Sequence, residues 1–257
     1  MNRGAELRLR LKEGGLIGGH VFFNDPAITE AMARYGYDFI WIDAEHGPFD
    51  KQQLLMHIMA ANGAGAAAFV RVTQATMEVV KPVLEMGIDA IIIPMIESAR
   101  EAEEAISLCC YPPKGTRGFG PRRAIAYNAQ DLGDYLACSE ESFLRIIQIE
   151  HINAVAEINA ILALDGLDGV IIGPNDLSAS IGLLGESLHR DVLDAGGRVI
   201  EAAKRAGKPV GVSIGPDKTA IETWQRLGVD FLSVGDDISF LHQGAMHTFA
   251  MMGRKLV

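Results

Sequence analysis

The sequence contains few cysteines, no dense group of basic residues and no long apolar run, and each scarcity excludes a class of protein. Only three of the 257 residues are cysteines, and Cys109 and Cys110 are adjacent, which does not suit a disulfide framework. The net charge is −10 without a Lys/Arg cluster, so we expect no nucleic-acid partner. No apolar run reaches the roughly 18 residues of a membrane span, and the first residues contain no apolar signal-peptide core. We therefore expect a cytoplasmic protein without a membrane partner.

Apolar residues are abundant, at 49% of the chain against 22% charged residues, which provides for a large core. They recur in eight runs rich in β-branched residues, most of them followed by a segment with helical period. Continuous apolar runs are typical of parallel strands covered on both faces. The runs are Leu16–Phe23, Asp38–Glu45, Ala67–Val72, Asp89–Met95, Leu144–Glu150, Asp168–Gly173, Pro209–Ile214 and Asp230–Gly235.

Eight strand–helix repeats predict an α/β fold, a single (β/α)8 TIM barrel domain over residues 1–257. An open, doubly wound sheet is the competing arrangement, but no GxGxxG motif follows the first run to support a dinucleotide site. One long connection, at about residues 111–143, interrupts the repeat and contains a predicted short helix near Leu132 to Ala137. A connection of this length is either a lid or binding loop or an ordered surface excursion.

Cap residues divide the helical segments from the strands. Asp25 before Pro26, Asp50, Ser98 and Asp217 each stand where a side chain can cap a helix start. Glycine, which accepts left-handed backbone angles, ends several helices just before the next strand. These glycines are Gly36, Gly87, Gly166, Gly207 and Gly228.

Polar residues at the carboxyl ends of the strands are the candidates for a site, because barrel active sites lie at that end. Gln148 and Glu150 are two apart and should share one face of their strand. Asp176 follows the next strand and could meet Glu150 at a similar height. Two carboxylates with waters and a chelating substrate suit a hard divalent cation. A structural pair between Glu150 and Arg71 is the alternative.

Two further polar residues follow neighbouring strands. Arg71 interrupts the apolar run AAAFVRV and needs an anionic partner, either a substrate or a structural carboxylate. His46 follows Asp43 and Glu45 at a strand end, a setting suited to acid/base work, although a lone histidine is more often structural. The other six histidines lack this setting and are treated as background. They are His20, His57, His151, His189, His242 and His247.

The run Gly173-Pro174-Asn175-Asp176-Leu177-Ser178 is predicted to open a helix. Exposed backbone N–H groups at such a start can bind a carboxylate. A plain Asx turn and helix cap explains the same residues equally well.

Taken together, these segments resemble the HpcH/HpaI aldolase family, from about Gly19 to about Gly235. The pieces that carry the resemblance are WIDAEHGPFD, the arginine ending the third strand, IIIPM, YPPKGTRGFG, QIE and GPNDLS, in the family's order. The resemblance implies a class II, metal-dependent aldolase of the 4-hydroxy-2-oxoheptanedioate or 2-keto-3-deoxy sugar acid type. Such enzymes cleave 4-hydroxy-2-oxo acids to pyruvate and an aldehyde and also run the reverse addition.

The resemblance also implies a role for each candidate residue. Glu150 and Asp176 are similar to the family's metal ligands, for Mg²⁺ or Mn²⁺, with Co²⁺ and Zn²⁺ as further candidates. Arg71 resembles the residue that binds pyruvate and stabilises its enolate, and His46 the acid/base residue. The remaining residues are expected to support these: Asp43 beside His46, Gln148 near the substrate, and Gly173, Pro174 and Asn175 around the pyruvate carboxylate.

Four positions depart from the family's pattern. The acid expected to support His46 is Glu85, where aspartate is more familiar. Val72 follows Arg71 in place of a frequent proline, and His151 follows Glu150 in place of threonine. Ser213 makes the end of the seventh strand more polar than the familiar apolar version. These changes bear on the aldehyde partner more than on the pyruvate chemistry.

Two other enzymes remain alternatives on the same barrel, an oxaloacetate-type 2-oxo acid decarboxylase and a CoA-thioester lyase. A catalytically silent binding barrel is a third. None of the eight strand runs contains a lysine for a Schiff base, which favours the metal mechanism. The apolar, Met-rich segment Ile238–Met252 is expected to pack on a partner subunit or on its own barrel. The resemblance implies a homo-oligomer, with a hexamer as the expected size.

Overall fold

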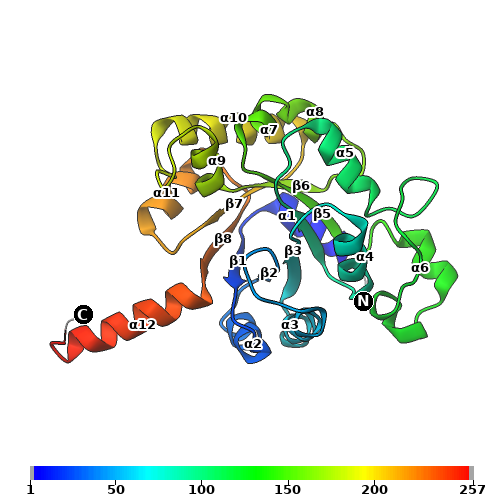
Figure 1. Cartoon of the computed structure of the whole chain (residues 1–257), viewed down its shortest axis with the longest axis horizontal. Helices are drawn as coiled ribbons and strands as arrows, with labels where there is room; N and C mark the ends of the chain where they lie inside the picture. The colour runs from blue at the N-terminus through cyan, green and yellow to red at the C-terminus, as the bar shows by residue number, and fades with distance from the viewer. Residues whose placement is uncertain (1–2, 255–257) are drawn as a thin grey trace.

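The chain folds into a closed barrel of eight parallel strands that follow one another in sequence order (Figure 1). The structure is a computed structural model, and it describes residues 3–254. β1 pairs with both β2 and β8, which closes the barrel. The predicted (β/α)8 fold is confirmed, and the open sheet is excluded. The strands are β1 (Leu16–Val21), β2 (Phe39–Asp43), β3 (Ala67–Arg71), β4 (Ala90–Ile93), β5 (Leu144–Ile149), β6 (Gly169–Ile172), β7 (Val210–Ile214) and β8 (Phe231–Asp236).

Helices surround the strands, and the predicted caps begin four of them. Asp25 accepts a hydrogen bond from the backbone N–H of Ala27, and Asp50 forms a reciprocal capping box with Gln53. Ser98 and Asp217 accept from backbone N–H groups of their own first turns. The helices are α1 (Gly4–Glu13), α2 (Pro26–Arg34), α3 (Lys51–Ala64), α4 (Met77–Glu85), α5 (Ala99–Ser107), the 3₁₀ helix η1 (Arg123–Asn128), α6 (Leu132–Cys138), α7 (Ile152–Ala156), α8 (Ile158–Leu162), α9 (Pro174–Ser180), α10 (Arg190–Ala206), α11 (Lys218–Leu227) and α12 (Asp237–Met251).

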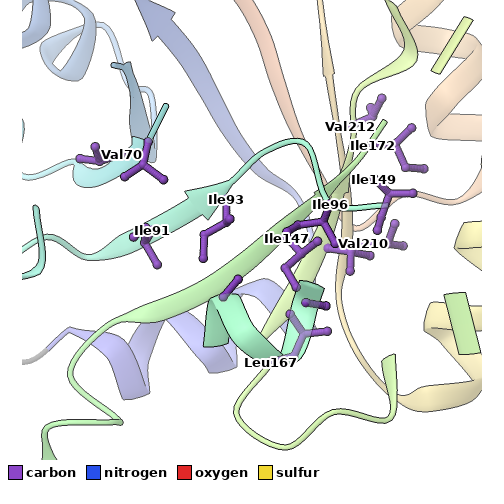
Figure 2. Close-up of a cluster of buried hydrophobic side chains, with 14 of the residues drawn as sticks. Val70, Ile91, Ile93, Ile96, Ile147, Ile149, Leu167, Ile172, Val210 and Val212 are labelled. Atoms are coloured by element: carbon purple, nitrogen blue, oxygen red, sulfur yellow. The ribbon is translucent and has the colours of Figure 1, made fainter. Parts of the chain in front are cut away.

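The core has two parts, because successive side chains of a strand point to opposite faces. One part fills the barrel, as with Phe39 and Phe69, whose rings stack at 4.3 Å. The other lies between strands and helices and includes Ile147, Ile149 and Ile172 (Figure 2). Leu7 and Leu11 of α1 belong to the interior part, so α1 closes the end of the barrel where the strands begin. The opposite end stays available for a site.

The long connection at residues 111–143 packs on α4 rather than standing free. The predicted short helix is α6. Arg117 is buried, stacks on the Tyr111 ring at 4.4 Å and donates to the hydroxyl of Tyr135 at 3.2 Å and to Glu85 at 3.3 Å. These contacts attach the segment to α4 at Glu85.

The last helix, α12, leaves the barrel and projects from it (Figure 1). Of its fifteen residues, only Asp237 is buried, while Ile238, Leu241 and Met246 are exposed. Within residues 3–254, none of the helices has both the length and the apolar character that a membrane span requires.

Candidate active site

A cavity of about 270 Å³ opens where the strands end, and most of the predicted site residues line it. They come from separate elements: His46 after β2, Arg71 from β3, Gln148 from β5 and Ser213 from β7. Gly173, Pro174, Asn175 and Asp176 line it from the junction of β6 and α9. A larger hollow of about 810 Å³ lies outside the barrel beside α2 and the start of α12 and contains none of them.

Glu150 and Gln148 share one face at the end of β5, as their spacing predicts. The amide of Gln148 donates to one carboxylate oxygen of Glu150, and the backbone N–H of Met95 donates to the other at 2.6 Å. Met95 adopts a left-handed φ of 58°, which is unusual for a residue with a side chain. Backbone strain of this kind is concentrated at functional sites, and here it accompanies the orientation of the Glu150 carboxylate.

Burial raises the pKa of Glu150 to about 7, and the nearby carboxylates of Asp176 and Glu45 add to the effect. The hydrogen bond from the Met95 N–H and, less strongly, the charge of Arg71 lower the pKa of Glu150 but do not cancel the effect of burial. Among residues 3–254, no basic side chain forms an ion pair with Glu150, because Arg71 pairs with Asp43 and Glu45. The predicted alternative of a Glu150–Arg71 pair is therefore not formed. A buried carboxylate that repels a second one is a fitting ligand for a cation.

The protein would supply few ligands to such a metal centre. Within the described part of the chain, no group of three or more His, Cys, Asp or Glu side chains is arranged to hold a metal. Glu150 and Asp176 would therefore supply two oxygen ligands, and water and substrate the others. Mg²⁺ and Mn²⁺ accept such a shell, because hard octahedral cations retain several waters and bind through one or two carboxylates.

Arg71 is held at the cavity by an acidic pair from the end of β2. Its guanidinium donates to Asp43, forms an ion pair with Glu45 at 2.9 Å, and lies 5.3 Å from the centre of the Trp41 ring. Burial is the largest single influence and would lower the pKa of Arg71, but the hydrogen bond to Asp43 and the negative charges of Asp43, Glu45 and Glu150 together raise it. Asp43 and Glu45 therefore fix the orientation of the Arg71 guanidinium, which lines the cavity.

His46 lies at the rim, with a side chain 62% exposed and Nε2 3.9 Å from a carboxylate oxygen of Glu45. Asp43 accepts the backbone N–H groups of Glu45 and His46, at 3.1 and 3.2 Å, and so shapes the turn that carries them. Asp43 thus positions both His46 and Arg71.

Glu85 is not brought to this site. It ends α4, which begins after the carboxyl end of β3 and runs back toward the start of β4. Its carboxylate accepts from Arg117 at the opposite end of the barrel. Within one chain the geometry does not support the predicted contact between Glu85 and His46, because the helix direction separates them.

The turn after β6 approaches the predicted ligands closely. A Cβ placed on Gly173 would lie 2.7 Å from Nε2 of Gln148 and 3.1 Å from Oε2 of Glu150. Inside α9, Ser178 donates to the carbonyl of Asn175 at 2.6 Å, while Gly173 at the N-cap provides no side-chain cap. Glycine is therefore needed at this position by the space that Gln148 and Glu150 occupy.

His20, which sequence reasoning left as background, is part of the cavity wall. Its Nε2 lies 3.3 Å from Oγ of Ser213 and its Nδ1 lies 3.2 Å from Oγ of Ser233. Burial lowers the pKa of His20 to about 4, so the ring is neutral. One signal was present, because a histidine interrupts the apolar run LIGGHVFF as Arg71 interrupts its own.

Comparisons with known proteins find relatives that cover most of the chain. The model of the HpcH/HpaI aldolase/citrate lyase family matches residues 17–242. The chain is 34% identical over 235 residues to a hydroxypyruvate/pyruvate aldolase of Roseovarius nubinhibens, covering 91% of each chain. It is 33% identical over 225 residues to a 5-keto-4-deoxy-D-glucarate aldolase of Escherichia coli, covering 86% of each. A family structure from Burkholderia cenocepacia superposes with a TM-score of 0.90 at 31% identity, covering 96% of this chain and 99% of that one.

Proposed function

Because this chain belongs to the HpcH/HpaI aldolase/citrate lyase family, we propose that it is an aldolase that cleaves 4-hydroxy-2-oxo acids to pyruvate and an aldehyde. The observation that carries the proposal is that Arg71 and Asp176 line one cavity at the carboxyl end of the barrel, while the buried carboxylate of Glu150 lies close enough for the charges of both to act on it. Relatives named as aldolases over about nine tenths of the chain support it.

We assign the cation site to Glu150 and Asp176, with Mg²⁺ or Mn²⁺ as the ion. Such a cation supplies Lewis-acid stabilisation for negative charge on the 2-oxo oxygen. The chain's own contribution is to fix the two ligands: Gln148 and the N–H of Met95 hold Glu150, and the start of α9 holds Asp176. Ligands that are oriented before substrate arrives avoid a reorganisation cost during the reaction.

The bond changes follow from the positions of His46 and Arg71. His46 takes the proton of the C4 hydroxyl, the C4–O bond becomes a carbonyl, and the electrons of the C3–C4 bond pass into the enolate of pyruvate. Arg71 contributes positive charge beside the oxygen on which negative charge develops. A proton then returns to C3 and completes pyruvate. Asp43 and Glu45 hold Arg71 in place throughout.

A coupled assay of pyruvate release tests the proposal, with a panel of 4-hydroxy-2-oxo acids in Mg²⁺, Mn²⁺ or EDTA. We expect EDTA to abolish release. Glu150→Gln should lower kcat/KM by at least about 100-fold, because losing even a group that supports a ligand costs roughly 10- to 100-fold. Glu103→Gln, an equal change at an exposed residue of α5, should leave kcat/KM unchanged.

Two outcomes would count against this function. Pyruvate release that survives EDTA and Glu150→Gln would exclude the assigned cation site. Consumption of oxaloacetate without cleavage of any 4-hydroxy-2-oxo acid would identify a decarboxylase on the same barrel.

We also propose that the protein is a homo-oligomer in which α12 packs on a second copy. α12 leaves its own barrel, and the 810 Å³ hollow at its base is lined by apolar residues of β1, α2 and β8. The exposed apolar side chains of α12, such as Leu241, and the apolar lining of the hollow are complementary in character. In two copies related by a twofold axis, α12 of each copy would cover the hollow of the other.

A further inference from the structure

The wall of the cavity across from Glu150 is polar and comes from β1, β7 and β8. In the closed order of the barrel, β1 and β8 lie across from β4 and β5. His20, Ser213 and Asp236 line the cavity there. The reaction uses none of them, because the two ligands, Arg71 and His46 act on the 2-oxo acid and the C4 hydroxyl. This wall is where the remainder of the substrate, the part released as aldehyde, would lie.

Ser233, His20 and Ser213 form one row of hydrogen bonds toward the cavity. Ser233 is fully buried and faces Nδ1 of His20, while Ser213 is half-buried and faces Nε2. The imidazole is also held between Phe22, at 5.9 Å, and Trp41, at 4.5 Å, measured between ring centres. A neutral imidazole uses one ring nitrogen as donor and the other as acceptor. The row therefore ends in a fixed hydroxyl with bonding capacity left for a ligand.

The charge of the same wall is negative. Asp236 lines it, and Arg71 is the one Arg or Lys among the described residues that line the cavity. Arg71 is already paired with Asp43 and Glu45. A carboxylate on the aldehyde would meet Asp236 without a free cation to balance it, which is unfavourable in a partly buried site.

We propose, given the aldolase function above, that the aldehyde partner is an uncharged hydroxyaldehyde whose hydroxyl is bound by Ser213. His20 is a positioning residue that holds the Ser213 hydroxyl in place. The cavity of about 270 Å³ also has to hold the 2-oxo acid part of the substrate, which favours a short aldehyde.

The preference for a hydroxyaldehyde follows from the hydrogen bonds that remain unmade when an aldehyde without a hydroxyl is bound. An alkyl chain at this wall would displace water from Ser213 and His20 without replacing the hydrogen bonds. A site built to bind a hydroxyl discriminates against an analogue that lacks it. One hydrogen bond at a half-buried position corresponds to about a tenfold preference in kcat/KM.

The test uses aldol addition at saturating pyruvate with Mg²⁺, with three short aldehydes as probes: glyceraldehyde, propanal and glyoxylate. Wild type should use glyceraldehyde about tenfold better than propanal and glyoxylate. Ser213→Ala should lower kcat/KM for glyceraldehyde by about tenfold and leave propanal within about twofold. Ser142→Ala, the same change in the connection before β5, is the matched control and should change neither value.

The positioning role of His20 has a separate readout. His20→Leu should lose the preference for glyceraldehyde over propanal, and His20→Gln, whose amide can still bond Ser213, should restore part of it. Equal loss for both aldehydes in Ser213→Ala, or a wild type that prefers propanal or glyoxylate, would overturn the proposal.

Exchange of the C3 protons of pyruvate in D₂O, followed by NMR without any aldehyde, separates the two proposals. Exchange that requires Mg²⁺ shows that the enolate chemistry operates whatever the aldehyde preference. If exchange is absent, the aldolase function itself fails.

Discussion

His20 makes the stability of the protein depend on pH through one side chain. Burial holds its pKa at about 4 against a reference of 6.5, although Asp43 and Asp236 raise it and Arg71 lowers it further. Between these values the unfolded chain binds the proton and the folded chain does not. The stability that neutral His20 contributes is therefore complete above pH 6.5 and is lost as pH falls toward 4.

The change that tests this is His20→Asn, with the free energy of unfolding measured in urea from pH 7.5 to pH 4. The difference of roughly 2.5 pKa units corresponds to about 3 kcal/mol. We expect the free energy of wild type to fall relative to that of the variant by about this amount over the range. Subtracting the variant removes the contribution of other groups, such as Glu45 and Glu150. A difference that does not change with pH would show that His20 titrates normally.

The sequence alone predicted some residues of the site and missed others. Arg71 and Glu150 could be predicted because each interrupts an apolar strand at its carboxyl end, where a charge needs a partner. The groups that contact them could not be predicted. Asp43 and Glu45 approach Arg71 from the end of β2, and Met95 approaches Glu150 from the end of β4. His20 was missed for the same reason, since Ser213 and Ser233 are about 200 residues away in the chain.

At the scale of elements, local signals predicted the starts of helices and most of the strands. Asp50 caps α3 and Asp217 caps α11, because a cap needs only its own first turn. The ends of strands were less accurate. The fourth run was predicted to Met95, but β4 ends at Ile93 and Met95 turns into a left-handed conformation beside Glu150. The conformation of Met95 depends on its contact with Glu150 at the end of β5, and the sequence around Met95 does not predict that contact.

The junction of β6 and α9 offers a test of one element's role in the site. Gly173→Ala would place a methyl group against the side-chain ends of Gln148 and Glu150. These ends can move, so we expect the fold to persist, with the free energy of unfolding within about 1 kcal/mol. The displaced Glu150 should lower kcat/KM for cleavage by about tenfold or more, because a ligand that misses its position by an ångström is costly.

Gly197→Ala is the matched control for this change. Gly197 lies in α10 with no neighbouring atom within 4 Å of the added Cβ. Alanine there should stabilise the helix by about 0.5–1 kcal/mol and leave kcat/KM unchanged. If Gly173→Ala were as active as Gly197→Ala, the assignment of Glu150 would lose its support.

On the scale of the whole molecule, the barrel brings together what the sequence separates. Eight repeats predicted the fold because a parallel sheet of this kind closes only in sequence order. The same rule predicted that the site would lie at the carboxyl ends of the strands, and it explains why Glu85 lies away from the cavity within one chain. That residue lies at the end of a helix, and helices run back to the far end of the barrel.

An apolar surface beside the start of α12 is left uncovered, and the last prediction rests on it. Ile17 belongs to a barrel strand yet is 48% exposed, because α12 leaves the outer face of β1 and β8 uncovered (Figure 1). Leu241 of α12 lines the hollow over that face and is 64% exposed. If a second copy covers both, these exposed apolar side chains are buried between subunits.

Leu241→Asp should therefore shift the protein from oligomer to smaller species, because a buried unpaired carboxylate opposes association. Leu9→Asp is the matched control, since Leu9 of α1 is also 64% exposed but lies at the closed end of the barrel. Light scattering after size-exclusion chromatography at one fixed concentration gives both masses. We expect wild type and Leu9→Asp to share one oligomeric mass and Leu241→Asp to have a lower one. A monomeric wild type, or a Leu241→Asp variant of unchanged mass, would mean that α12 does not form the contact between copies.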